Sequence, residues 1–370
     1  MYLLLYHDLT KKDSFFFIFI IYLLIRFSCY ILIKIIRIFV AKTYSKLCNY
    51  NREINKKSKL LEEIIMIIAV DHGNSAIKSV NYSFPSALEK HANKPPLATD
   101  ILEYNGSFWT MSGQRIPYMQ DKTKDDRFFI LTLIAIAKEM LHGGYLPPGA
   151  DIDLAVGLPP EHFSLMREPF TQYLKRGEVK FNFNDMATTI NIRNVFVYPQ
   201  AYAAVVPQGT RLKEEPRIFI VDIGGLTIDV LLLKNSVPDL HFCRSFENGV
   251  IPMTNFIIGK IGAHHGIKIV EDQIAAAIKG DSRLVLPQKV IEDILAYAKQ
   301  HSDMILDELR ENMVELKANP VIFIGGGAIL LKPFIENSPM IIKADYVLDE
   351  KANAKGYALL AAHHLKKALI

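Results

Sequence analysis

Two segments of the chain share an arrangement that strongly restricts the fold. In each, an apolar strand ends in Asp-x-Gly and turns at once into a second apolar strand, first over residues 66–80 and again over residues 217–233. A turn rich in small residues exposes backbone N–H groups, which bind phosphate oxygens without an intervening side chain. We therefore expect two similar halves that face each other, with both turns at one cleft.

The order of the remaining patterns indicates an α/β fold. Strand-like runs alternate with runs that carry apolar residues at helical spacing, and such alternation is typical of α/β domains. The strand-like runs are 152–156, 195–198 and 321–324, and the helical ones are 128–141, 161–174, 290–309 and 352–365.

Turn-forming residues separate these runs. Asn105-Gly106 lies between strand-like residues and predicts a hairpin over 104–113. The segment Phe84-Pro85-Ser86 is expected to break the strand pattern, and the polar residues 213–216 are expected to link two lobes.

Residues 1–65 differ from the rest of the chain because they contain no Gly and no Pro. They carry a net charge of +6 and the remaining residues −2, and a near-neutral body gives no indication of a broad nucleic-acid-binding surface. The apolar residues 15–33 are long enough to cross a bilayer, although Arg26 interrupts them. Basic residues after this run favour a cytoplasmic body. Two interpretations stay open: a membrane anchor, or an artefactual upstream translation with the true start at Met66.

The first Asp-x-Gly turn has the residue types of a phosphate site. Asp71 at the strand end can hold Mg²⁺ through water, and Gly73 permits close approach of a phosphate. Asn74 and Ser75 are small polar residues of the same turn, and Lys78 on the returning strand can supply a positive charge to the β-phosphate.

The second turn has the same character. Asp222 would face Asp71 across the cation, Gly224 and Gly225 expose the backbone, and the Thr227 hydroxyl adds a contact. We expect a structural role for Asp229.

A third glycine-rich element, Gly325, Gly326 and Gly327, follows the strand at 321–324. A turn of this kind allows a flat base or a ribose to pack on the backbone. By itself the triplet is also compatible with a tight strand-to-helix connection, and it lacks the Lys-Ser/Thr ending of a P-loop.

Taken in order, the three elements resemble the nucleotide site of the actin-like ATPase superfamily, over nearly all of residues 66–370. The hairpin at 104–113 and the segment 156–159 make the chain similar to the ParM/StbA-type actin-like proteins of plasmid segregation. The resemblance implies an actin-like ATPase fold, with two similar α/β lobes around a nucleotide cleft. The implied limits are a first lobe at 66–213, a second lobe at 214–350 and a C-terminal helix at 351–370 that returns to the first lobe.

The resemblance also implies roles for the three loops. The first two would bind the β- and γ-phosphates of ATP with Mg²⁺, and the third would bind the adenosine. Gln200, after the strand at 195–198, is the candidate for orienting the attacking water. A Gln positions water by hydrogen bonds but is no strong base. The segment 353–356 resembles a connection at which a small residue lets the lobes hinge.

The function implied is a cytoplasmic filament protein whose ATP hydrolysis is coupled to polymerisation, acting on plasmid DNA through an adaptor protein. No direct contact with nucleic acid is expected. Two alternatives remain: a small-molecule kinase of the same fold, and a membrane-tethered scaffold ATPase. Such kinases usually have large insertions that bind the substrate, and the chain shows no clear insertion of this kind. The membrane-tethered scaffold requires that residues 1–65 are part of the protein. The fold cannot choose among these.

Overall fold

The computed structural model describes residues 66–119, 121–144 and 149–368, with only the backbone at Leu240. The predicted membrane-crossing run and the whole of residues 1–65 lie outside this part of the chain. Within it, no helix combines the length and the apolar character needed to cross a membrane.

A nine-stranded mixed sheet forms what we call the first lobe, in the order β3-β2-β1-β7-β9-β8-β5-β6-β4. The parallel strands β1, β7 and β9 lie at its centre, and antiparallel hairpins extend it on both sides. The strands are β1 (Met66–His72), β2 (Ala76–Ser79), β3 (Ser83–Pro85), β4 (Leu88–His91), β5 (Leu102–Tyr104), β6 (Ser107–Met111), β7 (Ala150–Leu158), β8 (Gly177–Phe183) and β9 (Met186–Pro199).

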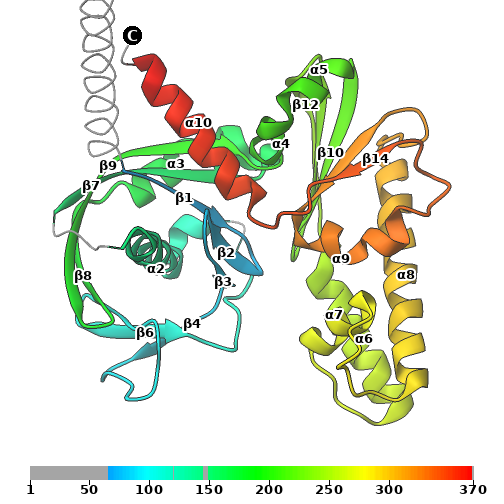
Figure 1. Cartoon of the computed structure of the whole chain (residues 1–370), viewed down its shortest axis with the longest axis horizontal. Helices are drawn as coiled ribbons and strands as arrows, with labels where there is room; N and C mark the ends of the chain where they lie inside the picture. The colour runs from blue at the N-terminus through cyan, green and yellow to red at the C-terminus, as the bar shows by residue number, and fades with distance from the viewer. Residues whose placement is uncertain (1–65, 120, 145–148, 369–370) are drawn as a thin grey trace, which may run out of the picture. The chain divides into compact units, whose positions relative to one another are not determined.

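The helix α2 (Arg127–His142) forms the centre of this lobe. Every residue from Phe128 to Ala137 is buried, and a helix that is apolar all round must be covered on all sides. Figure 1 shows the first sheet curving around α2. The short helices η1 (Lys122–Lys124) and η2 (Pro160–His162) and the helix α3 (Phe163–Leu174) complete the lobe.

A five-stranded sheet in the order β12-β11-β10-β13-β14 forms the second lobe. Along β10, Phe219 and Val221 pack against one set of helices and Ile218 and Ile220 against another, because successive side chains of a strand point to opposite faces. The strands are β10 (Arg217–Ile223), β11 (Ile228–Lys234), β12 (Val237–Phe246), β13 (Val321–Ile324) and β14 (Ala344–Tyr346). The helices on the first face are α6 (Val250–His265), α7 (Glu271–Lys279), α8 (Gln288–Glu311) and α9 (Gly325–Ile335). Those on the second are α4 (Tyr202–Val205) and α5 (Gly209–Glu214), with the short η3 (Val206–Gln208) between them in the chain.

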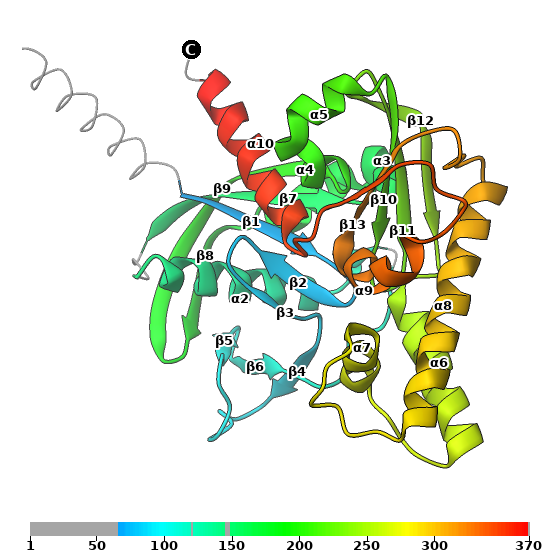
Figure 2. The same ribbon diagram turned by 45° about the vertical axis from the view of Figure 1, so that its right-hand side comes forward.

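The C-terminal helix α10 (Ala352–Ala368) follows the second lobe in sequence but packs on the outer face of the first sheet. Figures 1 and 2 both show it along β1 and beside α4. Its contacts are made largely by small residues, among them Ala69, Ala155 and Ala203. At Gly356 the approach is closest, since a Cβ there would lie 1.9 Å from the carbonyl oxygen of Ala203.

Most of the predicted strands and helices are present, but three local predictions were wrong. The segment at Phe84 does not end the strand pattern: Ser83–Pro85 form β3, and proline is tolerated there because β3 is an edge strand. Residues up to Glu214 belong to α5, so the link before β10 is shorter than predicted. The glycine triplet at 325–327 is the first turn of α9 rather than a loop before it.

The limits expected for the lobes, at residues 66–213, 214–350 and 351–370, remain a prediction. The helices α4 and α5 contact the second sheet through Ala204, Val205 and Leu212. Because Ala203 of the same segment packs against α10 and the first sheet, residues 201–214 bridge the two lobes.

Candidate functional site

The two Asp-x-Gly hairpins have the same register. In the first, Asp71 on β1 lies directly opposite Lys78 on β2, and in the second, Asp222 on β10 lies opposite Asp229 on β11. Residues directly opposite in an antiparallel pair place their side chains on the same face. Lys78 and Asp229 are therefore equivalent positions in the two hairpins, one cationic and one anionic.

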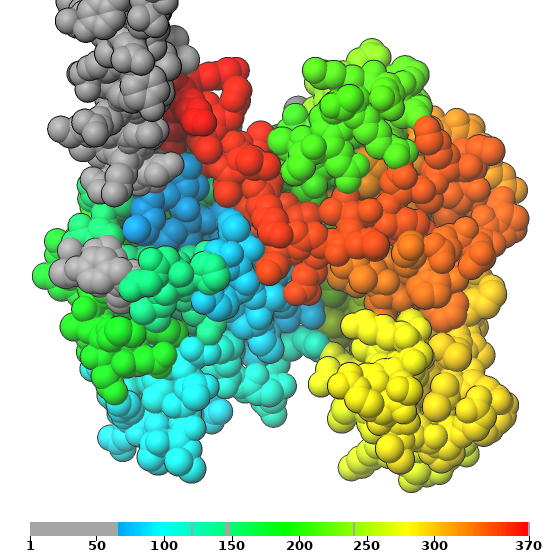
Figure 3. All heavy atoms as spheres, in the orientation of Figure 1, coloured from blue at the N-terminus to red at the C-terminus, as the bar shows by residue number. Residues whose placement is uncertain are grey.

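The hairpins meet at their turns. A Cβ added at Gly225 would lie 2.6 Å from the Cβ of Ser75, so only glycine allows the second turn to come this close to the first. Between them is an open pocket. Figure 3 also shows the surface hollowed between the cyan residues of the first lobe and the yellow residues of the second, although none of the yellow residues lines the pocket.

The pocket brings together nearly all the residues singled out in the sequence. Those that line it are Asp71, Gly73, Asn74, Ser75, Lys78, Gln200, Asp222, Gly224, Gly225, Thr227, Gly325 and Gly326. Gly327 does not line it. A Cβ at Gly327 would lie 2.5 Å from Cγ2 of Ile223, so this glycine is needed for packing α9 against β10.

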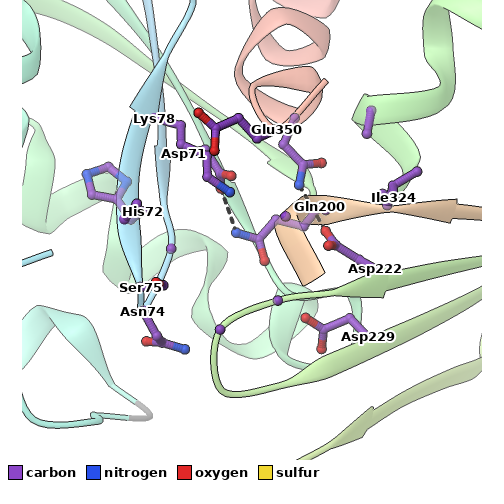
Figure 4. Close-up of a pocket in the computed structure, with 18 of the residues that line it drawn as sticks. Asp71, His72, Asn74, Ser75, Lys78, Gln200, Asp222, Asp229, Ile324 and Glu350 are labelled. Carbon is purple, nitrogen blue, oxygen red and sulfur yellow. Dashed lines mark hydrogen bonds between the residues drawn. The ribbon is translucent and has the colours of Figure 1, made fainter. Parts of the chain in front are cut away.

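Gln200 lies between the two central carboxylates, as Figure 4 shows. Its Nε2 donates to Oδ1 of Asp71 at 2.9 Å, and its side chain is buried. The next residue, Ala201, has a φ of 62°, which is strained for a residue with a Cβ. The backbone N–H of Ala201 donates to Oδ1 of Asn353 at 3.0 Å, and this contact holds the strained segment in place.

Two residues one turn apart on α10 hold the two carboxylates. Asn353 donates from Nδ2 to Oδ2 of Asp222 at 3.0 Å, and the buried hydroxyl of Tyr357 donates to Oδ1 of Asp71 at 3.4 Å. A Cβ at Gly157 would lie 2.0 Å from that hydroxyl, so glycine at this position makes room for it. One helix thus contacts the central carboxylate of each lobe.

Burial dominates the electrostatics of the pocket. The pKa of Asp222 is raised to about 7, chiefly by burial and also by the neighbouring Asp229 and Asp71, against the opposing effects of Lys78 and Asn353. Burial also raises the pKa of Asp229 to about 6, against hydrogen bonds from Ser245 and Thr227. Carboxylates in such surroundings favour a cation or a proton.

Two residues of the pocket were missed or misjudged in the sequence. Asp229, expected to be structural, lines the pocket, and its Oδ1 is buried with no hydrogen-bond partner among the described residues. Its spacing from Asp222 equals that of Lys78 from Asp71, and this repeat could have revealed it. Lys122 also lines the pocket but follows no motif, since its loop is folded back to the site only in three dimensions.

The residues present fit a hydrated divalent cation and a phosphate chain. Mg²⁺ keeps several of its waters and takes one or two carboxylates, which suits Asp71 and Asp222. The unpartnered oxygen of Asp229 and the backbone of the two turns offer further polar contacts. The part of the chain that the structure describes has no group of three or more His, Cys, Asp or Glu able to hold a metal ion.

Two α/β lobes that each contribute an Asp-x-Gly hairpin to one pocket define the actin-like fold. Two family models match the chain accordingly. The model for the N-terminal domain of actin-like proteins matches residues 69–202, and the model for the C-terminal part of the archaeal actin homologue MreB-like matches residues 220–337. The chain therefore belongs to the actin-like proteins.

Solved structures agree with this assignment, although no curated protein sequence matches the chain. An archaeal actin homologue in complex with ADP has a TM-score of 0.66 at 20% identity, over 80% of this chain and 99% of that one. A 15-stranded ParM filament from Clostridium botulinum has a TM-score of 0.64 at 18% identity, over 80% and 99%. ParM of Bacillus thuringiensis with AMPPNP has a TM-score of 0.61 at 14% identity, over 82% and 99%. The resemblance to ParM-type actin-like proteins is thus confirmed at the level of the fold.

Proposed function

We propose that this protein binds ATP with Mg²⁺ between the two hairpin turns and hydrolyses it, and that the nucleotide state controls assembly into filaments. The observation that carries the proposal is the group formed by Asp71, Gln200 and Asp222, in which a carboxamide lies between two buried carboxylates. Catalysis of phosphoryl transfer consists mainly of positioning and electrostatic stabilisation, which such a group supplies.

In this proposal each element of the pocket has a distinct task. The backbone of the two turns binds the β- and γ-phosphates, and Lys78 contributes positive charge. Asp71 and Asp222 hold Mg²⁺ through its waters, and the ion would neutralise phosphate charge. The Gln200 carboxamide orients the attacking water. Gly326 leaves room for the adenosine, since a Cβ there would meet no described atom within 4 Å outside its own helix, and Gly325 lies beside it in the lining of the pocket.

Self-association is supported by the neighbours, which include filaments. We infer further that the filament moves or separates plasmid DNA through an adaptor protein in the cytoplasm. The net charge of −2 over residues 66–370 agrees with indirect contact to DNA.

The experiment is to add Mg²⁺ and ATP to the purified protein and to measure light scattering together with phosphate release. We expect polymers that depend on nucleotide and phosphate release that accompanies them. ADP formation that requires a sugar or another small acceptor, with the phosphate transferred to that acceptor and without polymers, would instead support the small-molecule kinase.

The site has its own test in Asp222→Ala. This change should abolish phosphate release while the lobes stay folded, as judged by circular dichroism. Turnover at the normal rate would show that Asp222 has no part in holding Mg²⁺.

A further inference from the structure

Lys122 is the one side chain of η1 that reaches the pocket, and it comes from a loop with no phosphate motif. Its Nζ donates to the backbone carbonyl oxygen of His72, the residue between Asp71 and Gly73. The ammonium group lies 5.3 Å from the centre of the Phe128 ring. These contacts hold the cation against the first hairpin turn.

The charge of Lys122 is poorly balanced. Asp71 and Asp229 stabilise the ammonium electrostatically, but neither forms an ion pair with it within the described residues. Burial lowers the pKa of Lys122 to about 8. The neighbouring ring of His72 is neutral, because burial and the nearby lysine lower its pKa to about 3, so it neither balances nor repels the ammonium group. A cation in this state is stabilised by an anion that enters the pocket.

The position of Lys122 shows which part of a ligand it would meet. A second cavity adjoins the pocket, and the residues that line both are Asn74, Lys122, Pro159 and Thr227. By contrast, Ile324, Gly325 and Gly326 line only the first pocket. A nucleotide whose adenosine lies along the start of α9 would therefore direct its phosphate chain toward the wall that contains Lys122.

We propose that Lys122 binds the terminal phosphate of a nucleoside triphosphate and thereby distinguishes a triphosphate from a diphosphate. This rests on the proposed nucleotide-binding function. Lys78 lies opposite Asp71 at the strand end and would contact the β-phosphate, which both nucleotides possess. Lys122 would contact the group that only the triphosphate has.

The test compares two affinities in the full chain. Dissociation constants for ADP and for the non-hydrolysable analogue AMPPNP are measured by calorimetry with Mg²⁺, in the wild type and in Lys122→Met. Loss of a charged hydrogen bond predicts AMPPNP binding weakened by roughly 10- to 100-fold and ADP binding changed by less than about 2-fold. The matched control is Lys124→Met, whose side chain is 78% exposed and pairs with Asp121 at the surface. It should change neither affinity.

The outcomes separate the two proposals. If the wild type binds neither nucleotide, the proposed function fails and this inference with it. If the wild type binds both, and Lys122→Met weakens both equally or neither, the inference alone is wrong. Should Lys122→Met prove unfolded by circular dichroism, the milder Lys122→Gln variant serves for the same comparison.

Discussion

Asn353 donates from Nδ2 to Oδ2 of Asp222 at 3.0 Å, while its own Oδ1 accepts the backbone N–H of Ala201. One carboxamide on α10 therefore connects a carboxylate of the second lobe with the segment that carries Gln200. The C-terminal helix is thus part of the pocket. Its position determines where Asp222 and the segment that carries Gln200 lie.

Asn353→Ala should lower phosphate release by about 10-fold or more while nucleotide affinity changes less, because the carboxamide of Asn353 is engaged in positioning Asp222 and Ala201. The hydrogen bond from Asn353 lowers the pKa of Asp222. Without it the carboxyl group is protonated at higher pH, so the acidic limb of the pH–rate profile should move upward. Asn337→Ala, at an exposed residue that donates to a backbone carbonyl oxygen, is the control. An unchanged profile would show that Asn353 acts only in packing.

Asp222→Asn should stabilise the nucleotide-free protein at pH 8. Because burial raises the pKa of Asp222 to about 7, ionisation of this group opposes folding once the pH exceeds the unfolded value of about 4. Three pKa units correspond to up to about 4 kcal/mol at pH 8, and the difference between variant and wild type should vanish as the pH falls to 4. Urea unfolding at several pH values measures it. Asp303→Asn, at a surface ion pair, should show no such dependence.

Gly356→Ala should destabilise the protein by roughly 1–3 kcal/mol. The new methyl group would meet the carbonyl oxygen of Ala203 at 1.9 Å, and a backbone atom cannot rotate away. Gly259→Ala in α6 is a matched control, since nothing lies within 4 Å of its Cβ and alanine favours a helix by up to about 1 kcal/mol. Thermal denaturation of both variants measures the contrast. If the two variants unfold at the same temperature, α10 does not pack as closely on Ala203 as described.

Glu271→Gln should speed the release of bound nucleotide by a few fold. Arg115 of the first lobe forms a two-pronged ion pair with Glu271 at the start of α7 in the second lobe, and this contact crosses between the lobes. Both side chains are about one-third exposed, so the pair contributes on the order of 1 kcal/mol. Displacement of a fluorescent nucleotide measures the rate.

The control for that change is Asp185→Asn, which breaks the exposed pair with Lys94 inside the first lobe. It should leave the release rate unaltered. If both variants release nucleotide at the wild-type rate, the Arg115–Glu271 pair does not restrain the lobes.

Local patterns in the sequence were sufficient where the physical cause is local. The hairpin at Asn105 is present as predicted, because both turn residues adopt the positive φ that Asn-Gly favours. The two Asp-x-Gly hairpins were predictable for a similar reason, since strand, turn and returning strand are contiguous. The three glycines at the start of α9 were also singled out from the sequence. Gly325 and Gly326 line the pocket, whereas Gly327 packs against β10.

By itself, then, the sequence determined an α/β fold and the residues of the two turns, because short-range backbone geometry and strand alternation define them. That the fold is actin-like was implied by the resemblance of the three loops taken in order. Only the tertiary structure decided that Lys122, Asp229 and Asn353 line the same pocket and that the buried Tyr357 contacts its Asp71. Their contribution depends on burial and on contacts between segments distant in the chain, and such contacts leave no periodic or local pattern. The Asp-x-Gly turns provide the backbone that lines the pocket, whereas packing of α10 and the loop before α2 against them sets the charge and position of the side chains around it.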